Sequence, residues 1–125
     1  EMPSSNGVGD ARSLARFYAA LVGEVEGTRL LGPEQLALAC EQQSFGPDKV
    51  IFHETCFGLG YALQPPLAPA AGPRAFGHPG AGGALAFADP DAELGFAYVL
   101  NAMQFSLEGD PRSASLVEAA YSCLR

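Results

Sequence analysis

Two apolar runs late in the chain constrain the fold more than any other feature. Residues 84–88 and 94–100 are dominated by Ala, Leu, Phe and Val, and only the five residues from Asp89 to Glu93 separate them. This short connection reads Asp-Pro-Asp-Ala-Glu, in which the proline presets its φ angle and the aspartates favour a turn. The two runs are therefore predicted to form an antiparallel hairpin.

Segments with helical periodicity lie on both sides of this hairpin in the sequence. The first is predicted to begin after Asp10, a good N-cap, and to end at Gly23. A short second helix is expected to start at Pro33, and a third follows Asp110, with proline again in the first turn. The order is helix, helix, three strands, helix, which lacks the alternation of a parallel sheet. We predict an α+β fold over residues 1–125, an antiparallel β-sheet flanked by helices.

Glycines and prolines indicate the structure of the segments between these elements. Gln42 to Thr55 has no clear period and is interpreted as a loop or lid. Residues 57–63, Phe-Gly-Leu-Gly-Tyr-Ala-Leu, are interpreted as one strand that another backbone approaches closely. The stretch from Gln64 to Arg74 holds four prolines, which exclude a helix interior or a central strand. It is predicted to be a connection.

Composition excludes several classes of function. The formal charge is −7 with a single lysine, so no basic stripe exists for nucleic-acid phosphates. No apolar run reaches the length of a membrane span. The three cysteines form no C-x-x-C pair, which fits buried free thiols better than a disulfide framework, although one pair plus one free thiol stays open. A reducing, cytoplasmic compartment is preferred on this ground, and the localisation is otherwise unassigned.

The densest chemical signal is residues 76–83, Phe-Gly-His-Pro-Gly-Ala-Gly-Gly. Its glycines allow a ligand or another backbone to approach closely, and exposed amides in such a stretch can point at a developing oxyanion. Here the chain resembles the serine β-lactamase and penicillin-binding-protein family, especially class C enzymes and related esterases, whose third signature is K-T-G or H-x-G. The similarity extends from the small-residue turn before the first helix to the return strand of the hairpin.

This resemblance implies a fold and a set of site residues. The chain would be the C-terminal part of a β-lactamase/transpeptidase-like fold. His78 would take the place of the basic residue of the signature, Pro79 the middle position and Gly80 the glycine. A backbone amide near Ala81 would help to hold the substrate carbonyl oxygen. His78 and Gly80 have a plainer interpretation as parts of a glycine-rich bend, which the resemblance makes the less favoured one.

Two family signatures are missing from the sequence. The nucleophile motif S-x-x-K is absent, and no tyrosine begins a Y-x-N. In the family both motifs lie upstream of the matched region, so the pattern, together with a first residue Glu1, favours a truncated chain. We therefore expect no catalytic nucleophile or general base here, no ester hydrolysis by residues 1–125 alone, and a requirement for the N-terminal part of the same domain. An incomplete sheet of this kind should expose an edge and self-associate.

The leading functional hypothesis is acyl transfer from an ester or amide to water, with no cofactor. Histidine in place of lysine favours an esterase, because a neutral imidazole holds a substrate carboxylate less strongly than a permanent cation. Two alternatives are a non-catalytic binding module and a structural half that joins a separate N-terminal chain. A zinc site is disfavoured, because Cys40, His53, Cys56 and Cys123 lack paired short spacing and His53-Glu54 lacks the second histidine of H-E-x-x-H.

Overall fold

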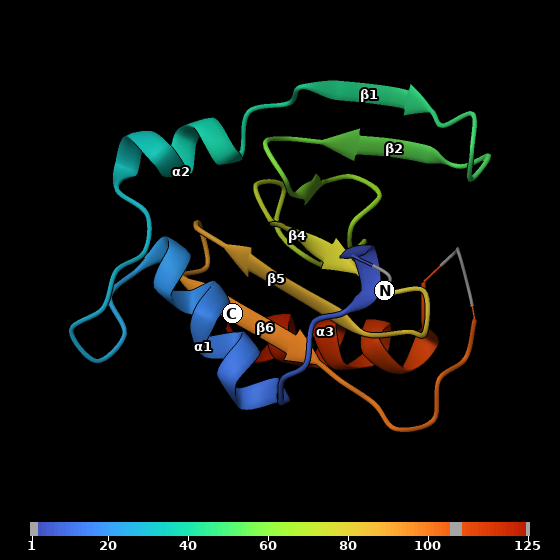
Figure 1. Cartoon of the computed structure of the whole chain (residues 1–125). Helices are drawn as coiled ribbons and strands as arrows, with labels where there is room; N and C mark the ends of the chain where they lie inside the picture. Colours follow the sequence, from blue (N-terminus) through green and yellow to red (C-terminus); the bar gives the residue numbers. More distant parts are fainter. Residues whose placement is uncertain (1–2, 106–108, 125) are drawn as a thin grey trace.

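The sheet is antiparallel and follows the order of the chain. The structure is a computed structural model that describes residues 3–105 and 109–124. Six strands pair in the order β1-β2-β3-β4-β5-β6, each antiparallel to its neighbours (Figure 1). The strands are β1 (Ser44–Pro47), β2 (Glu54–Phe57), β3 (Ala62–Leu63), β4 (Phe76–Pro79), β5 (Leu85–Asp89) and β6 (Leu94–Tyr98). The helices are a short 3-10 helix η1 (Pro3–Ser5) and α1 (Ala11–Val22), α2 (Pro33–Ala39) and α3 (Pro111–Cys123).

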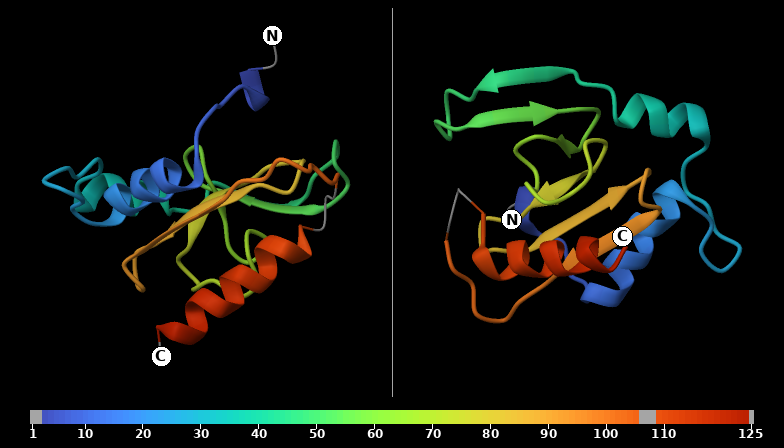
Figure 2. Two further views of the ribbon diagram at one scale, coloured as in Figure 1. Left: turned by 90° about the horizontal axis from the view of Figure 1, so that it is seen from below. Right: turned by 180° about the vertical axis from the view of Figure 1, so that it is seen from behind.

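Helices cover both faces of the sheet, which confirms the predicted α+β class. Figure 2 shows α1 and α3 on opposite sides of the strands. Alternation along each strand divides the core into two clusters. One cluster packs Tyr18 and Leu21 of α1 and Leu36 of α2 against one face. The other packs α3 and the proline-rich connection against the opposite face, through Val117 and Leu67.

The three predicted helices begin where their caps indicated. The Asp10 carboxylate accepts a hydrogen bond from the Ser13 amide at 2.8 Å and starts α1. Gly32 precedes Pro33 at the start of α2, and the Asp110 carboxylate accepts from the Arg112 amide to start α3. The hydrogen bonds satisfy amides that the first helical turn otherwise leaves unpaired.

Two predictions about the strands were wrong. Residues 42–55 are not a loop, because they contain β1 and the first half of β2, and these strands pair from Ser44 opposite Phe57 to Pro47 opposite Glu54. Residues 57–63 are not one strand, because β2 ends at Phe57, residues 58–61 turn, and β3 returns antiparallel. Gly60 has φ +86°, a conformation that favours glycine and turns the chain.

Gly95 brings α1 unusually close to the sheet. A Cβ atom on Gly95 would lie 2.4 Å from the Ala15 carbonyl oxygen and 2.4 Å from the Ala19 nitrogen, both in the helix backbone. A real Cβ does not approach backbone atoms this closely, so α1 rests on β6 only because residue 95 has no side chain. The packing of one whole layer thus depends on a single glycine.

Asp89 ties three distant segments together at the far end of the hairpin. Its side chain is 1% exposed and accepts hydrogen bonds from the amides of Gly72, Asp91 and Ala92. The Tyr121 hydroxyl donates to the same carboxylate at 2.5 Å. The proline-rich connection, the β5–β6 turn and α3 therefore share one acceptor. Burial and this hydrogen bond raise the pKa of the Tyr121 hydroxyl, which keeps it a donor.

The largely buried side chain of Tyr18 makes the fold sensitive to alkaline pH. Burial raises its pKa from 10.0 to about 12. Between these two values the folded state keeps a proton that the unfolded state releases. The contribution of the neutral Tyr18 hydroxyl to the free energy of unfolding is therefore complete below pH 10 and is lost as the pH rises toward 12. We expect the free energy of unfolding of the wild type to fall by about 1.4 kcal/mol per pH unit in that window because of Tyr18. In Tyr18→Phe this part of the fall should be absent. Urea unfolding midpoints of the wild type and Tyr18→Phe across it measure this, and parallel curves would contradict it.

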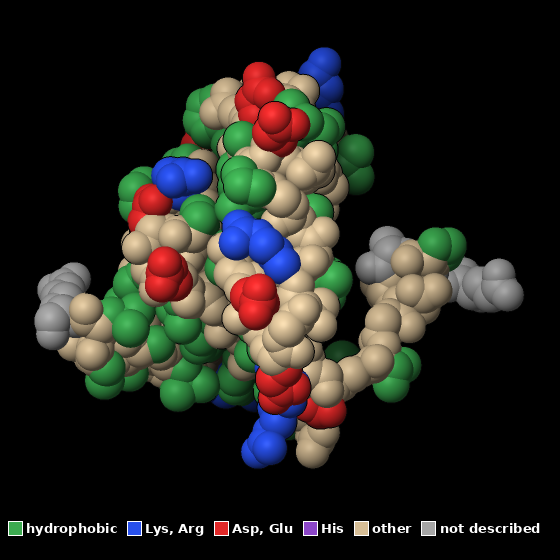
Figure 3. Space-filling model, turned by 90° about the vertical axis from the view of Figure 1, so that its left-hand side faces the viewer, with side chains coloured by type: hydrophobic (Ala, Val, Ile, Leu, Met, Phe, Trp, Pro, Cys, Tyr) green, Lys and Arg blue, Asp and Glu red, His purple; other side chains and the backbone are tan. Residues whose placement is uncertain are grey.

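The cysteines, the charged side chains and the helix lengths can each be compared with what the sequence predicted. All three cysteines are free, but only Cys56 is buried, whereas Cys40 is half-buried and Cys123 is exposed, so the expectation of buried thiols is wrong for Cys123. Figure 3 shows basic and acidic side chains interspersed on the face it presents. Within residues 3–105 and 109–124, no helix is long and apolar enough to cross a membrane.

Candidate functional site

Strand β4 carries the predicted site residues from the core to the surface. Phe76 and Gly77 are buried, whereas His78 and Pro79 are exposed. Gly77 leaves no room for a side chain, since a Cβ there would lie 2.1 Å from the Ala86 carbonyl oxygen. His78 pairs with Ala86 and Pro79 with Leu85 across the β4–β5 ladder. The buried half of the strand anchors it, and the half that follows presents its side chains to solvent.

The imidazole of His78 has a defined local geometry. Its Nδ1 lies 2.7 Å from the Pro79 carbonyl oxygen. A carbonyl oxygen only accepts hydrogen bonds, so in this contact Nδ1 donates and the neutral ring keeps Nε2 as an acceptor. The ring also stacks on Phe57 of β2, with ring centroids 6.0 Å apart. These contacts orient an exposed histidine that would otherwise rotate freely.

The chain after Gly80 forms a tight turn that contains Ala81. The Gly83 amide donates to the Gly80 carbonyl at 2.8 Å, and the Gly80 amide donates to the Ala84 carbonyl at 2.7 Å. Ala81 is exposed at the tip. Among residues 3–105 and 109–124, no backbone carbonyl accepts from the Ala81 amide. The structure thus brings His78, Pro79, Gly80 and Ala81 together at one exposed end of β4, but the predicted role of each in substrate binding stays a prediction.

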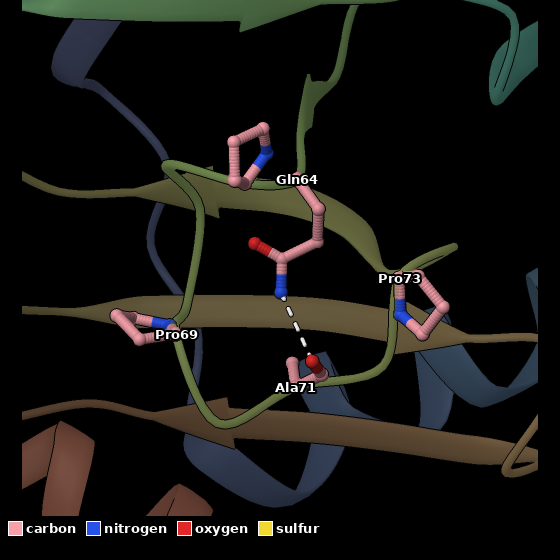
Figure 4. Close-up of a pocket in the computed structure, with 5 residues that line it drawn as sticks. Gln64, Pro69, Ala71 and Pro73 are labelled. Atoms are coloured by element: carbon pink, nitrogen blue, oxygen red, sulfur yellow. Dashed lines mark hydrogen bonds between the residues drawn. The ribbon is translucent and has the colours of Figure 1, made fainter.

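A shallow depression lies away from this end of β4, over the proline-rich connection. It has a volume of about 570 Å³ and is lined by Gln64, Pro65, Pro69, Ala71 and Pro73. Figure 4 shows the Gln64 amide reaching across the inside of this loop toward Ala71. Its Nε2 donates to the carbonyls of Ala68 and Ala71, and its Oε1 accepts from the Ala68 amide. The one polar side chain in this lining is therefore engaged in holding the loop, and the depression offers no nucleophile or titratable group.

Two thiols line a smaller pocket of about 200 Å³ beside the sheet, where α2 ends at Cys40. Cys40 and Cys56 share it with Gln42, Leu63, Gln64, Pro73, Arg74 and Ala75. Burial raises the pKa of both thiols, which keeps them protonated and weakly nucleophilic. Among residues 3–105 and 109–124, no three His, Cys, Asp or Glu side chains gather as metal ligands would. The zinc set weighed from the sequence is not brought together there.

Comparison with known proteins assigns the chain to a family. The family model described as Beta-lactamase matches residues 1–120. The chain belongs to the β-lactamase family. Its sequence is 38% identical over 104 residues to Esterase/beta-lactamase LipL of Mycobacterium tuberculosis, covering 81% of this chain and 24% of that protein.

Solved structures of β-lactamase-family relatives share the fold described above. A family VIII carboxylesterase superposes with a TM-score of 0.85 at 38% identity, covering 92% of this chain and 32% of that one. A penicillin-binding protein homologue from Caulobacter crescentus superposes with a TM-score of 0.83 at 39% identity, covering 91% and 32%. The chain thus spans about a quarter of the curated relative and about a third of each solved structure, which confirms the expected resemblance and its partial extent.

Sequence reasoning overlooked the residues that hold the Gly80–Ala84 turn of this β-lactamase-family chain. From the sequence, Asp110 marks only the start of the last helix, yet it is 5% exposed and lies against Gly83. Arg112 was not singled out at all, yet it pairs with Asp110 and reaches the carbonyl of Ala102. One available signal was the spacing Asp110-Pro111-Arg112, because a cap and an arginine two residues apart can pair at the start of a helix.

Proposed function

We propose that this chain supplies the substrate-facing H-x-G strand of a serine hydrolase that cleaves esters or amides by acyl transfer to water. In this reaction a serine oxygen bonds to the substrate carbonyl carbon, the alcohol or amine leaves, and water then releases the acid. The serine and the groups that move its proton come from a part of the protein outside residues 1–125. His78, Pro79, Gly80 and Ala81 bind the substrate and stabilise the oxyanion.

The observation that carries this proposal is the exposed end of β4. His78 and Pro79 form the exposed half of an anchored strand, Gly80 follows it directly, and the amide of Ala81 comes next at the tip of a tight turn. A backbone amide fixed in this way suits a developing oxyanion, because it needs no reorganisation during the reaction. Relatives named as an esterase/β-lactamase and a family VIII carboxylesterase support the same reaction class.

The hydrogen bond of His78 favours neutral esters as substrates. With Nδ1 donating to the Pro79 carbonyl, the neutral ring presents Nε2 as an acceptor toward solvent. An acceptor does not hold a substrate carboxylate, whereas lysine would do so with a permanent charge. In our proposal the backbone near Ala81 therefore donates to the substrate carbonyl oxygen. Nε2 of His78 instead accepts a hydrogen bond from a group in the site that carries a proton, such as a hydroxyl.

The N-terminal part of the same domain is proposed to join the sheet at β6. Strands β1 and β6 are the two edges of the sheet among the described residues. Three of the four residues of β1 are exposed, whereas every residue of β6 is partly buried, with α1 and α3 covering it. An edge that is covered on both faces suits a strand inside a wider sheet. Without its neighbour, the unpaired β6 favours self-association.

We expect the serine reaction to require more than residues 1–125. The complete polypeptide should label with a fluorophosphonate probe and hydrolyse short-chain p-nitrophenyl esters, whereas residues 1–125 alone should show neither activity. The reason is that no S-x-x-K occurs in the chain. Mass spectrometry of the labelled peptide and burst kinetics measure this outcome. Saturable turnover by residues 1–125 that a single serine substitution abolishes would contradict the proposal.

A non-catalytic binding module in the same fold is the second candidate. It would use the same exposed end of β4 to hold a ligand without turnover. In that case the complete polypeptide would bind an ester or a β-lactam reversibly, and no serine would be labelled. Equilibrium dialysis beside the probe experiment separates the two candidates.

A further inference from the structure

The turn that carries Ala81 is held from behind by the start of α3. Asp110 caps this helix, and its side chain is 2% exposed. Its Oδ2 atom lies 2.2 Å from the point where a Cβ on Gly83 would stand. Gly83 has φ +104°, so both its backbone conformation and its neighbour require glycine. The carboxylate therefore packs directly on the backbone of the turn.

Arg112 extends this contact to a second segment. Its Nε donates to both oxygens of Asp110 at 2.9 and 3.1 Å, and one terminal nitrogen donates to Oδ2 at 2.5 Å. The other terminal nitrogen donates to the Ala102 carbonyl at 3.0 Å. This arrangement lowers the pKa of Asp110, chiefly through the side-chain hydrogen bond from Arg112, so that the pair stays charged. The planar guanidinium thus joins α3 to the segment after β6.

The segment after β6, which Arg112 contacts at Ala102, also contacts the turn itself. The Gln104 amide donates to the Gly82 carbonyl at 3.0 Å. The side chain of Met103 lies over Gly82, with its sulfur 3.0 Å from where a Cβ would stand. Gly82 and Gly83 are therefore fixed from two sides, one through Gln104 and one through Asp110. Ala81 is the residue directly before this fixed pair.

We infer that Asp110 and Arg112 are positioning residues that set the orientation of the backbone at Ala81 in the hydrolase site. The inference rests on the proposed function, because it names what holds the donor of that site. The ion pair, the Ala102 carbonyl and the Gln104–Gly82 bond form one rigid support for the turn. All three guanidinium nitrogens of Arg112 donate to protein acceptors, so Arg112 acts through the turn and not on a substrate anion.

The test uses the complete polypeptide with substitutions at Arg112. Because a donor displaced by about 1 Å costs on the order of a hundredfold in rate, Arg112→Met should lower kcat for a neutral p-nitrophenyl ester by about tenfold to a hundredfold, with KM changed less than about threefold. Arg112→Lys should restore only part of the loss, since a lysine pairs with Asp110 but does not also bridge to Ala102. Arg74→Met is the matched control, because Arg74 pairs with Asp91 at 2.8 Å in an exposed ion pair at the other end of β5. It should leave both constants unchanged.

Hydrogen exchange gives a readout that does not depend on activity. In Arg112→Met, amides of residues 80–85 should exchange at least about tenfold faster, while those of α1 stay unchanged. Unchanged exchange in the turn, or unchanged kcat in an active enzyme, overturns the positioning role and leaves the proposed function standing. A rise of KM confined to carboxylate-bearing esters overturns it in favour of direct anion binding. A wild type that neither labels nor turns over overturns the proposed function and this inference together.

Discussion

Gly95→Val is expected to prevent the chain from reaching its native fold. The valine Cβ would meet the carbonyl oxygen of Ala15 and the nitrogen of Ala19, each at 2.4 Å, and neither is a side-chain atom that can rotate away. Helix α1 would have to leave β6 and uncover Tyr18 and Leu21, which are part of the core beneath it. Overpacking alone costs about 1–3 kcal/mol, and uncovering two large side chains adds about 3 kcal/mol or more. That sum is comparable with the stability of many domains.

A graded pair of variants keeps this prediction measurable when the valine variant is insoluble. Gly95→Ala should fold in the complete polypeptide but lose about 3 kcal/mol of unfolding free energy, because a methyl group makes the same backbone contacts. Gly23→Ala is the matched control at the end of α1, where a Cβ would lie 3.7 Å from the Ala19 carbonyl, an ordinary contact. Denaturant unfolding followed by circular dichroism compares them. Equal midpoints for Gly95→Ala and the wild type would contradict the account of α1 packing.

His78→Ala is expected to lower kcat/KM of the complete enzyme for short-chain esters by about tenfold to a thousandfold, the range for loss of a positioned polar group. The imidazole is oriented by the Pro79 carbonyl and by Phe57, and it is exposed at the end of an anchored strand. Because the side chain is exposed, its removal should change stability by no more than about 0.5 kcal/mol. Steady-state kinetics and thermal melting of the same preparations measure both effects.

Two further variants separate a site residue from a surface histidine. His53→Ala removes the other histidine of the chain, which is also exposed, and should leave kcat/KM within about twofold of the wild type. His78→Lys should gain binding of a chromogenic cephalosporin, because it adds a permanent cation for the carboxylate. Unchanged kinetics of His78→Ala on every ester would remove His78 from the site.

The sequence predicted those helices and strands that are determined by residues close together in the chain. Asp10, Pro33 and Asp110 mark helix starts because caps and first-turn prolines act within one turn of the helix. The β5–β6 hairpin follows from a short turn between two apolar runs. By contrast, the β1–β2 hairpin was missed because three of the four residues of β1 and one of the four of β2 are exposed, so no alternation marks the strands.

The candidate site was only partly predictable for a related reason. His78, Pro79, Gly80 and Ala81 are consecutive, so their proximity needs no tertiary information. The support from Asp110 and Arg112 depends on a contact with Gly83, which is far away along the chain, and on a hydrogen bond from Arg112 to Ala102 across the connection before α3. A capping aspartate reads the same in the sequence whether or not its carboxylate packs on another turn. Only the three-dimensional arrangement distinguishes the two.

The shared acceptor at Asp89 has a consequence for the order in which the chain folds. Its carboxylate is satisfied only after the β5–β6 turn, Gly72 and Tyr121 have all arrived. Contacts between such distant residues close late and open together, because each lost partner leaves a buried oxygen of Asp89 without its hydrogen bond. The proline-rich connection should therefore unfold with α3 and the hairpin as one cooperative unit, although by composition it looks like a surface loop free to fray on its own.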